Sequence, residues 1–145
     1  MNEQFTWLHI GLGSFHRAHQ AWYLHRLQVM GDKRWSIAAG NIRNDAEHVV
    51  QALSAQKGRY VLETVSPEGV SEYEEITSIQ KLIPWQADLQ PLIAEGADPK
   101  TKVIAFTVTE GGYYLNTSHK LEVNNPDLAA DLKGGCKTIY GVITR

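Results

Sequence analysis

The sequence contains little of what marks several classes of protein. It has a single cysteine, Cys136, among 145 residues, so it forms no internal disulfide, and a disulfide-stabilised secreted scaffold is excluded. Residues 1–5 carry no positive charge ahead of an apolar run, which predicts no secretory signal. No apolar stretch reaches the length of a transmembrane helix, which predicts no membrane partner. Together these absences predict a cytoplasmic protein.

Positive and negative charges are also nearly balanced in the sequence. The chain has 14 Lys and Arg against 16 Asp and Glu, so the composition predicts no nucleic-acid partner. An apolar fraction of 43% in a chain of this length is sufficient for a hydrophobic core. These values are typical of a globular α/β or α+β domain.

Short apolar runs predict the strands. Runs at 5–10, 35–39 and 103–108 have the length and bulk of strands. The run 103–108 is continuous and β-branched, which predicts a parallel strand covered on both faces. Residues 60–65 and 70–79 flank a turn and predict an antiparallel hairpin.

Helical spacing and capping residues predict helices between these strands. They are expected over 15–30, from Asn44 or Asp45 to Gly58, over 88–94, and after Asn125. Pro84 predicts an irregular or edge segment at 82–85. The resulting order predicts an α/β fold with a mostly parallel sheet, crossover helices and the hairpin as an insertion.

A glycine motif follows the first predicted strand directly. Gly11 and Gly13 stand where a strand turns into a helix, the context in which a dinucleotide pyrophosphate is bound by backbone N–H groups. His16 takes the place of the third glycine of the usual pattern, so a side chain must fit between helix and sheet. The motif favours a Rossmann-like nucleotide-binding fold, and a turn that uses glycine for geometry alone is the alternative.

The second predicted strand should end near the adenosine ribose of such a nucleotide. Asn41 and Asp45 follow that end and are candidates to contact the ribose. The charge of Asp45 disfavours a 2′-phosphate, whereas Arg43 favours one, and we expect NAD rather than NADP. Asp45 is equally suited to capping the next helix.

His16 and His19 lie three residues apart, on one helical face. A metal site needs further ligands, and no cysteine or carboxylate cluster is near in sequence, so no metal is expected. Arg17 is suited to pairing with phosphate or to being solvated. Packed histidines with satisfied hydrogen bonds are the alternative to a ligand-binding role.

A second glycine-containing loop follows the strand at 103–108. Thr109 and Glu110 lie beyond its carboxyl end, where ligands bind in doubly wound sheets. They are candidates to line the cofactor site. A glycine turn with a solvated Glu110 is the alternative.

The segments 11–20 and 107–113 together resemble two signatures of the mannitol dehydrogenase family, long-chain dehydrogenases that act on polyols. That family also carries histidine in place of the third glycine. The resemblance implies NAD-dependent, metal-independent oxidation of a sugar alcohol, of the D-arabinitol or mannitol type, to a ketose. Carried over by position, it assigns the pyrophosphate turn to Gly11, Gly13, Ser14 and Phe15, places Asp45 near the adenosine ribose, and places Thr109 and Glu110 on the cofactor side of the cleft. His16 and Asn41 are further candidates for the cofactor site.

The resemblance also implies that residues 1–145 are the N-terminal part of a dinucleotide-binding domain, incomplete at the C-terminus. Family members have a second, helical domain whose catalytic lysine stands in a Lys-x4-Asn-x2-His pattern, and no lysine here has that context. The isolated chain is therefore expected to be inactive. A small-molecule polyol substrate is expected to bind only in the full-length enzyme of which this chain would be a part. The apolar residues of 138–145 are expected to lack partners, and an exposed sheet edge is expected to permit self-association. A stand-alone nucleotide-binding or oligomerising module without catalysis is the alternative.

Overall fold

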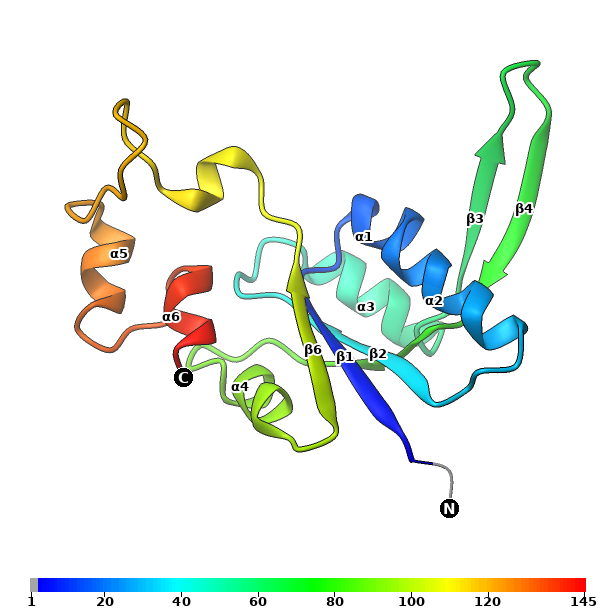
Figure 1. Ribbon diagram of the computed structural model, residues 1–145, viewed down its shortest axis with the longest axis horizontal. Helices are drawn as coiled ribbons and strands as arrows, with labels where there is room; N and C mark the ends of the chain where they lie inside the picture. Colours follow the sequence, from blue (N-terminus) through cyan, green and yellow to red (C-terminus); the bar gives the residue numbers. More distant parts are fainter. Residues whose placement is uncertain (1–2) are drawn as a thin grey trace.

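A parallel four-stranded sheet forms the centre of the computed structural model (Figure 1), which describes residues 3–145. Met1 and Asn2, part of the segment without signal character, lie outside the described residues. The strand order is β5-β2-β1-β6, and each neighbouring pair is parallel. The strands are β1 (Phe5–Ile10), β2 (Trp35–Gly40), β5 (Ile79–Leu82) and β6 (Thr101–Phe106). This order corresponds to strands 3-2-1-4 of a doubly wound sheet, so it includes the point where the order reverses, and it confirms the predicted Rossmann-like fold.

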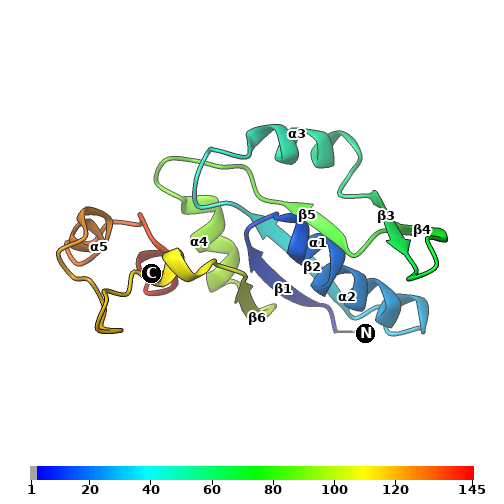
Figure 2. The same ribbon diagram turned by 90° about the horizontal axis from the view of Figure 1, so that it is seen from above.

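Helices cover both faces of the sheet, and the hairpin of β3 (Tyr60–Val65) and β4 (Ser71–Ile76) extends away from it. The hairpin and the α5–α6 region lie at opposite ends of the molecule (Figure 2). The helices are α1 (Ser14–Ala18), α2 (Gln20–Val29), α3 (Glu47–Ala55), α4 (Gln90–Ala97), α5 (Pro126–Asp131) and α6 (Ile139–Ile143), with a 3-10 turn, η1, at Glu110–Tyr113. Among residues 3–145, no helix has the length and apolar character needed to cross a membrane.

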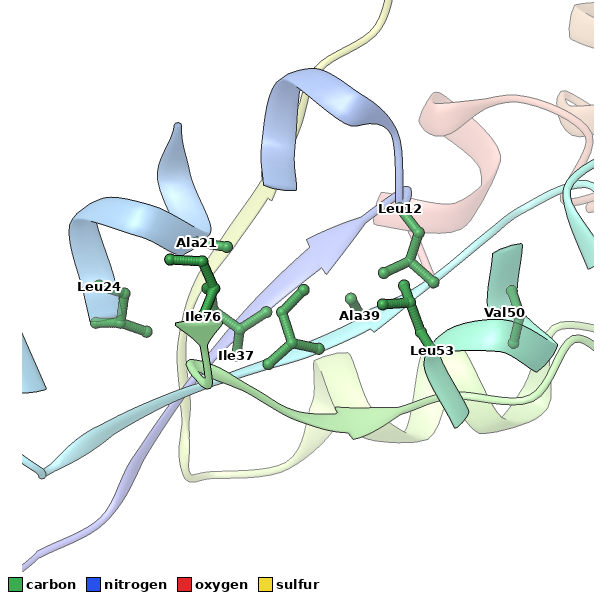
Figure 3. Close-up of a cluster of buried hydrophobic side chains, with 9 residues drawn as sticks. Leu12, Ala21, Leu24, Ile37, Ala39, Val50, Leu53 and Ile76 are labelled. Carbon is green, nitrogen blue, oxygen red and sulfur yellow. The ribbon is translucent and has the colours of Figure 1, made fainter. Parts of the chain in front are cut away.

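The alternation of side chains along β2 divides the core into two clusters. Ile37 and Ala39 face α2 and α3, where they pack with Leu24 and Leu53 (Figure 3). Ala38 points to the opposite face, in the cluster that contains residues of α4 and α6. Because both faces are packed, β2 has the continuous apolar character of a strand covered on two sides.

The predicted helix 15–30 is wrong in one respect, because it is two helices separated at His19. The backbone of His19 has φ -120° and ψ -77°, outside the helical region. Its ring nitrogen and its backbone N–H both donate to the carbonyl of Phe15. The break turns the chain at the start of α2, while the apolar spacing continues across it.

The predicted return strand 70–79 also divides. β4 ends at Ile76, and Ile79 begins β5 in the central sheet. The Ser78 hydroxyl donates to the carbonyl of Ala21 at 2.6 Å and fixes this crossing against α2. β5 is a short edge strand that ends before Pro84, in line with the expected edge character of this region.

The prediction of a covered strand at 103–108 is wrong. β6 spans Thr101–Phe106 and lies at the edge of the sheet. Val103 and Ile104 are 37% and 44% exposed, and successive strand residues point to opposite faces, so both faces are partly open. Apolar continuity indicates that a strand can be covered, but the neighbouring elements decide whether it is.

Two expectations about helix ends also need correction. Ala46 precedes α3 and no side chain caps that helix, so neither Asn44 nor Asp45 is its cap. α6 does not lack partners, because Ile139 and Val142 are buried in the second cluster. The predicted start of α5 is confirmed, with the Asn125 side chain accepting from the N–H of Asp127.

Candidate functional site

A cleft of about 540 Å³ opens at the carboxyl ends of β1, β2 and β6. In doubly wound sheets ligands bind at this edge, where the strand order reverses. Loops from separate parts of the chain, together with the start of α6, form its walls. The lining residues are Ile10, Gly11, Asn41, Ile42, Arg43, Asp45, Thr107, Val108, Thr109, Gly111, Gly112, Tyr114, Asp127, Thr138 and Ile139.

The glycine turn forms the wall at the end of β1. Gly11 has φ +117°, a conformation that L side chains rarely adopt, and its N–H donates to the carbonyl of Gly40 at 2.7 Å. A side chain at Gly13 would meet no atom within 4 Å. Among the described residues, the N–H groups of Gly13, Ser14 and Phe15 have no hydrogen-bond acceptor. The turn therefore offers free donors beside open space, as a bound phosphate requires.

The peptide between Gly11 and Leu12 is held at both ends. The carbonyl oxygen of Gly11 accepts from Nδ1 of His9 at 2.8 Å. The N–H of Leu12 donates to Oδ1 of Asn41 at 3.1 Å. Asn41 thus connects the end of β2 to the glycine turn, so it shapes the turn through its side chain.

His16 is fully buried behind the turn, where the third glycine would lie. Its ring stacks on His9 with centroids 3.5 Å apart and planes at 17°. Its Nδ1 is 2.8 Å from Oε1 of Gln20. Burial and, to a smaller extent, the neighbouring His9 together lower the pKa of His16 to about 4. The ring is therefore neutral at pH 7 and lies inside the protein, against His9.

Charged groups from distant segments meet across the cleft. Arg43 lies 3.9 Å from a carboxylate oxygen of Asp127 and donates to the hydroxyl of Tyr114 at 3.2 Å. Asp45 adds a second carboxylate to the lining. The cation of Arg43 is thus opposed by carboxylates at this end of the cleft.

The loop after β6 forms the remaining wall. Thr109 lines the cleft, whereas Glu110 begins η1 with its side chain exposed and does not. Gly112 packs so closely that an added Cβ would lie 2.9 Å from Cβ of Val108. The close approach of Gly112 to Val108 leaves no room for a side chain at this position of the loop.

The predicted site residues thus fall into two groups. Gly11, Asn41, Asp45 and Thr109 come together in the cleft lining. Gly13, Ser14 and Phe15 follow in the adjoining turn, where Phe15 exposes its ring and stacks it on His19 at 4.2 Å. His16 and Glu110 do not contribute side chains to the lining, since His16 is buried behind the turn and Glu110 is exposed outside the lining residues.

Sequence reasoning missed Tyr114, Asp127 and Thr138 as lining residues. Tyr114 directly follows the glycine-containing segment 107–113, so its position in the sequence could have identified it as a lining residue. Asp127 and Thr138 carry only helix-start signals in sequence and reach the cleft through tertiary packing. Between residues 3 and 145, no three His, Cys, Asp or Glu side chains gather as a metal site, and Cys136 lies outside the cleft lining.

Comparisons with known proteins agree with this architecture. The family described as "Mannitol dehydrogenase Rossmann domain" matches residues 6–137. The chain is 82% identical over all its residues to a D-arabinitol 4-dehydrogenase of Klebsiella pneumoniae, of which it covers 32%. It is 56% identical over 94% of its length to a D-arabinitol 4-dehydrogenase of Ralstonia nicotianae and covers 30% of that protein.

A solved structure gives the same result. The chain resembles the mannitol 2-dehydrogenase of Pseudomonas fluorescens in its ternary complex with NAD and D-mannitol, with a TM-score of 0.87 and 29% identity. The match covers 98% of this chain and 30% of that one. The chain therefore spans about a third of the length of the relatives it matches.

Proposed function

The chain belongs to the mannitol dehydrogenase family, and we propose that its cleft binds NAD as the cofactor-binding part of an enzyme that oxidises a sugar alcohol to a ketose. The observation that carries this proposal is the glycine turn, whose free N–H groups adjoin a cleft at the carboxyl ends of parallel strands. NAD, when bound, supplies the hydride acceptor for the reaction. The similarity to a mannitol 2-dehydrogenase bound to NAD supports the choice of cofactor.

Each residue of the turn has its own role in binding the pyrophosphate. Gly11 adopts the left-handed conformation that turns the chain, and Gly13 leaves room for the phosphate. The N–H groups of Gly13, Ser14 and Phe15 donate to its oxygens. Thr109 borders the cofactor from the opposite wall, and we assign no direct contact to the side chains of His16 and Glu110.

The charges near the end of β2 favour NAD over NADP. Asp45 and Asp127 both line the cleft, and Asp127 opposes the cation of Arg43. A 2′-phosphate would meet both carboxylates there, at a cost of about 1 kcal/mol for exposed charges. We expect NADP to bind about fivefold more weakly than NAD. Asp45→Asn should reduce this difference between the two affinities, because it removes one of the two carboxylates.

Titration calorimetry with NAD tests cofactor binding directly. Gly13→Val is the sharpest variant, because its backbone has φ -65°, which valine tolerates, and its side chain would enter open space. The fold should be retained while NAD affinity falls about tenfold or more. Gly96→Ala, on α4, is the matched control and should bind NAD normally. Equal affinity of Gly13→Val and the unaltered chain would contradict the proposed site.

The substrate class follows from the relatives, and we propose a polyol of the D-arabinitol or mannitol type for the whole enzyme. No lysine of the chain stands in the Lys-x4-Asn-x2-His pattern expected of the catalytic base, so we propose that this base lies in a further, helical domain. Purified alone, the 145 residues should show no turnover of D-arabinitol or mannitol with NAD. Measurable NADH production would contradict this part of the proposal.

An oligomerising module is the second candidate, and the open edge of β6 favours it. Val103 and Ile104 are exposed beside unpaired backbone groups, a surface that readily pairs with another strand. Sedimentation velocity should then show a concentration-dependent dimer that Ile104→Lys abolishes. Val61→Lys, at an exposed position of β3, is the control. A chain that stays monomeric at high concentration excludes this candidate.

A further inference from the structure

We propose that His9 and His16 are positioning residues for the phosphate-binding turn, acting through the carbonyl of Gly11. The proposal rests on the proposed function of the turn and adds the means by which the turn is held in shape. Both imidazoles are fully buried and stacked between β1 and α1. Neither lines the cleft, so neither is assigned a contact with the cofactor.

The hydrogen bonds of the two rings determine which nitrogen carries the proton. Gly11 O is a carbonyl oxygen and accepts only, so Nδ1 of His9 must carry the proton of the 2.8 Å hydrogen bond. Nδ1 of His16 likewise faces Oε1 of Gln20 at 2.8 Å. The Nε2 atoms of both rings are buried without a hydrogen-bond partner among the described residues. Both rings are therefore neutral, with the proton on Nδ1.

Stacking and the contact with Gln20 hold the two rings in place. His16 covers the face of His9 at 3.5 Å, and Gln20 holds His16 from α2. Burial disfavours a positive charge on either ring, and two positive rings at that distance would repel each other, so the pair is held as neutral imidazoles. Arg17, on the same helix, directs its Nε to the carbonyl of Leu12. His9 is thus kept in the one tautomer and orientation that can donate to Gly11.

The hydrogen bond from His9 acts on the glycine turn through the peptide between Gly11 and Leu12. Gly11 has φ +117°, and its peptide with Leu12 is fixed on one side by His9 and on the other by Asn41. Since the next N–H groups are free, the orientation of this peptide sets where they point. A loose Gly11 carbonyl would let the turn sample other conformations, and NAD affinity would fall by the fraction of time spent in them.

Two substitutions at position 9 separate the ring from its hydrogen bond. His9→Phe keeps an aromatic ring for stacking and removes only the donor, because Nε2 already lacks a partner. His9→Asn removes the ring but keeps an N–H near the Nδ1 position. We expect His9→Phe to bind NAD about fivefold more weakly, the range of one lost hydrogen bond. His9→Asn should recover most of that affinity, which a purely packing role would not produce.

His25→Phe is the matched control, because His25 is also buried but bonds Thr77 at the other end of α2. It should lose stability without losing NAD affinity. Unchanged affinity in His9→Phe, or equal losses in His9→Phe and His9→Asn, would overturn the proposal and leave the proposed function intact.

Hydrogen exchange of the Leu12 amide, measured without NAD, decides the matter if the unaltered chain fails to bind NAD. This amide donates to Asn41 and should exchange about fivefold faster in His9→Phe than in His9→Asn. Equal exchange rates in the two variants would overturn the proposal independently of any cofactor.

Discussion

The neutral state of His16 makes the stability of the chain depend on pH, and this dependence is measurable. Burial lowers the folded-state pKa from 6.5 to about 4, whereas the unfolded chain keeps the ordinary value. Between these values the unfolded state binds more protons, so the free energy of unfolding falls as the pH falls from about 6.5 to 4. The stability that His16 contributes is complete above pH 6.5.

The magnitude follows from the gap between the two pKa values. Within that window the free energy of unfolding changes by about 1.36 kcal/mol for each pH unit, so the whole gap between the pKa values corresponds to about 3 kcal/mol. Most of it lies above pH 5, and the step from pH 7 to pH 5 should remove about 2 kcal/mol through His16. His9 adds to the same trend, since burial also lowers its pKa.

Urea unfolding at pH 7 and pH 5, followed by the fluorescence of the four tryptophans, tests this reasoning. Other groups also titrate in this range, so the quantity to measure is the difference between the chain and His16→Phe, which keeps a stacked ring but cannot bind a proton. The unaltered chain should lose about 2 kcal/mol more than the variant. His19→Phe, an exposed histidine on the next turn, is the control. An identical pH dependence of the chain and His16→Phe would refute the neutral buried pair.

Further predictions concern two glycines and the start of α6. Gly58 and Gly69 have similar positive φ angles, +78° and +83°, but a Cβ at Gly58 would collide with the carbonyl oxygen of Ile79 while one at Gly69 meets nothing. Thermal unfolding should therefore show that Gly69→Ala lowers the free energy of unfolding by about 1 kcal/mol. Gly58→Ala should lower it by at least about 2 kcal/mol more. Equal losses in the two variants would exclude the close approach of Gly58 to the Ile79 carbonyl. Asp131 accepts three hydrogen bonds at the start of α6, so Asp131→Asn should lower the free energy of unfolding by about 1–3 kcal/mol, against little change for Asp98→Asn in an exposed turn.

Local signals were sufficient for much of the fold. β1 and β3 begin and end where their patterns predict, the turn of the hairpin lies where it was expected, and α2 and α3 end within three residues of the predicted glycines, Gly31 and Gly58. In each case the information lies within a few residues, in side-chain alternation, a turn or a cap. The mannitol dehydrogenase resemblance rests on two such local segments, and the family match agrees with it.

The errors arise where a position depends on what packs against it. Val103 and Ile104 have the pattern of covered residues but lie on an edge strand, while Ile139 and Val142 were expected to be open and are buried. The cleft shows the same limit, since Asp127 enters it through the packing of α5 rather than through any motif.

The sequence by itself determined most of the alternation of strands and helices along the chain, the glycine turn after β1 and the family, because each depends on short-range geometry and residue type. Only the tertiary structure decided which side chains share the cleft, which strand edge is open, and that His9 and His16 stack as a neutral pair behind Gly11. These properties depend on contacts between segments far apart in the chain and on the loss of water around them.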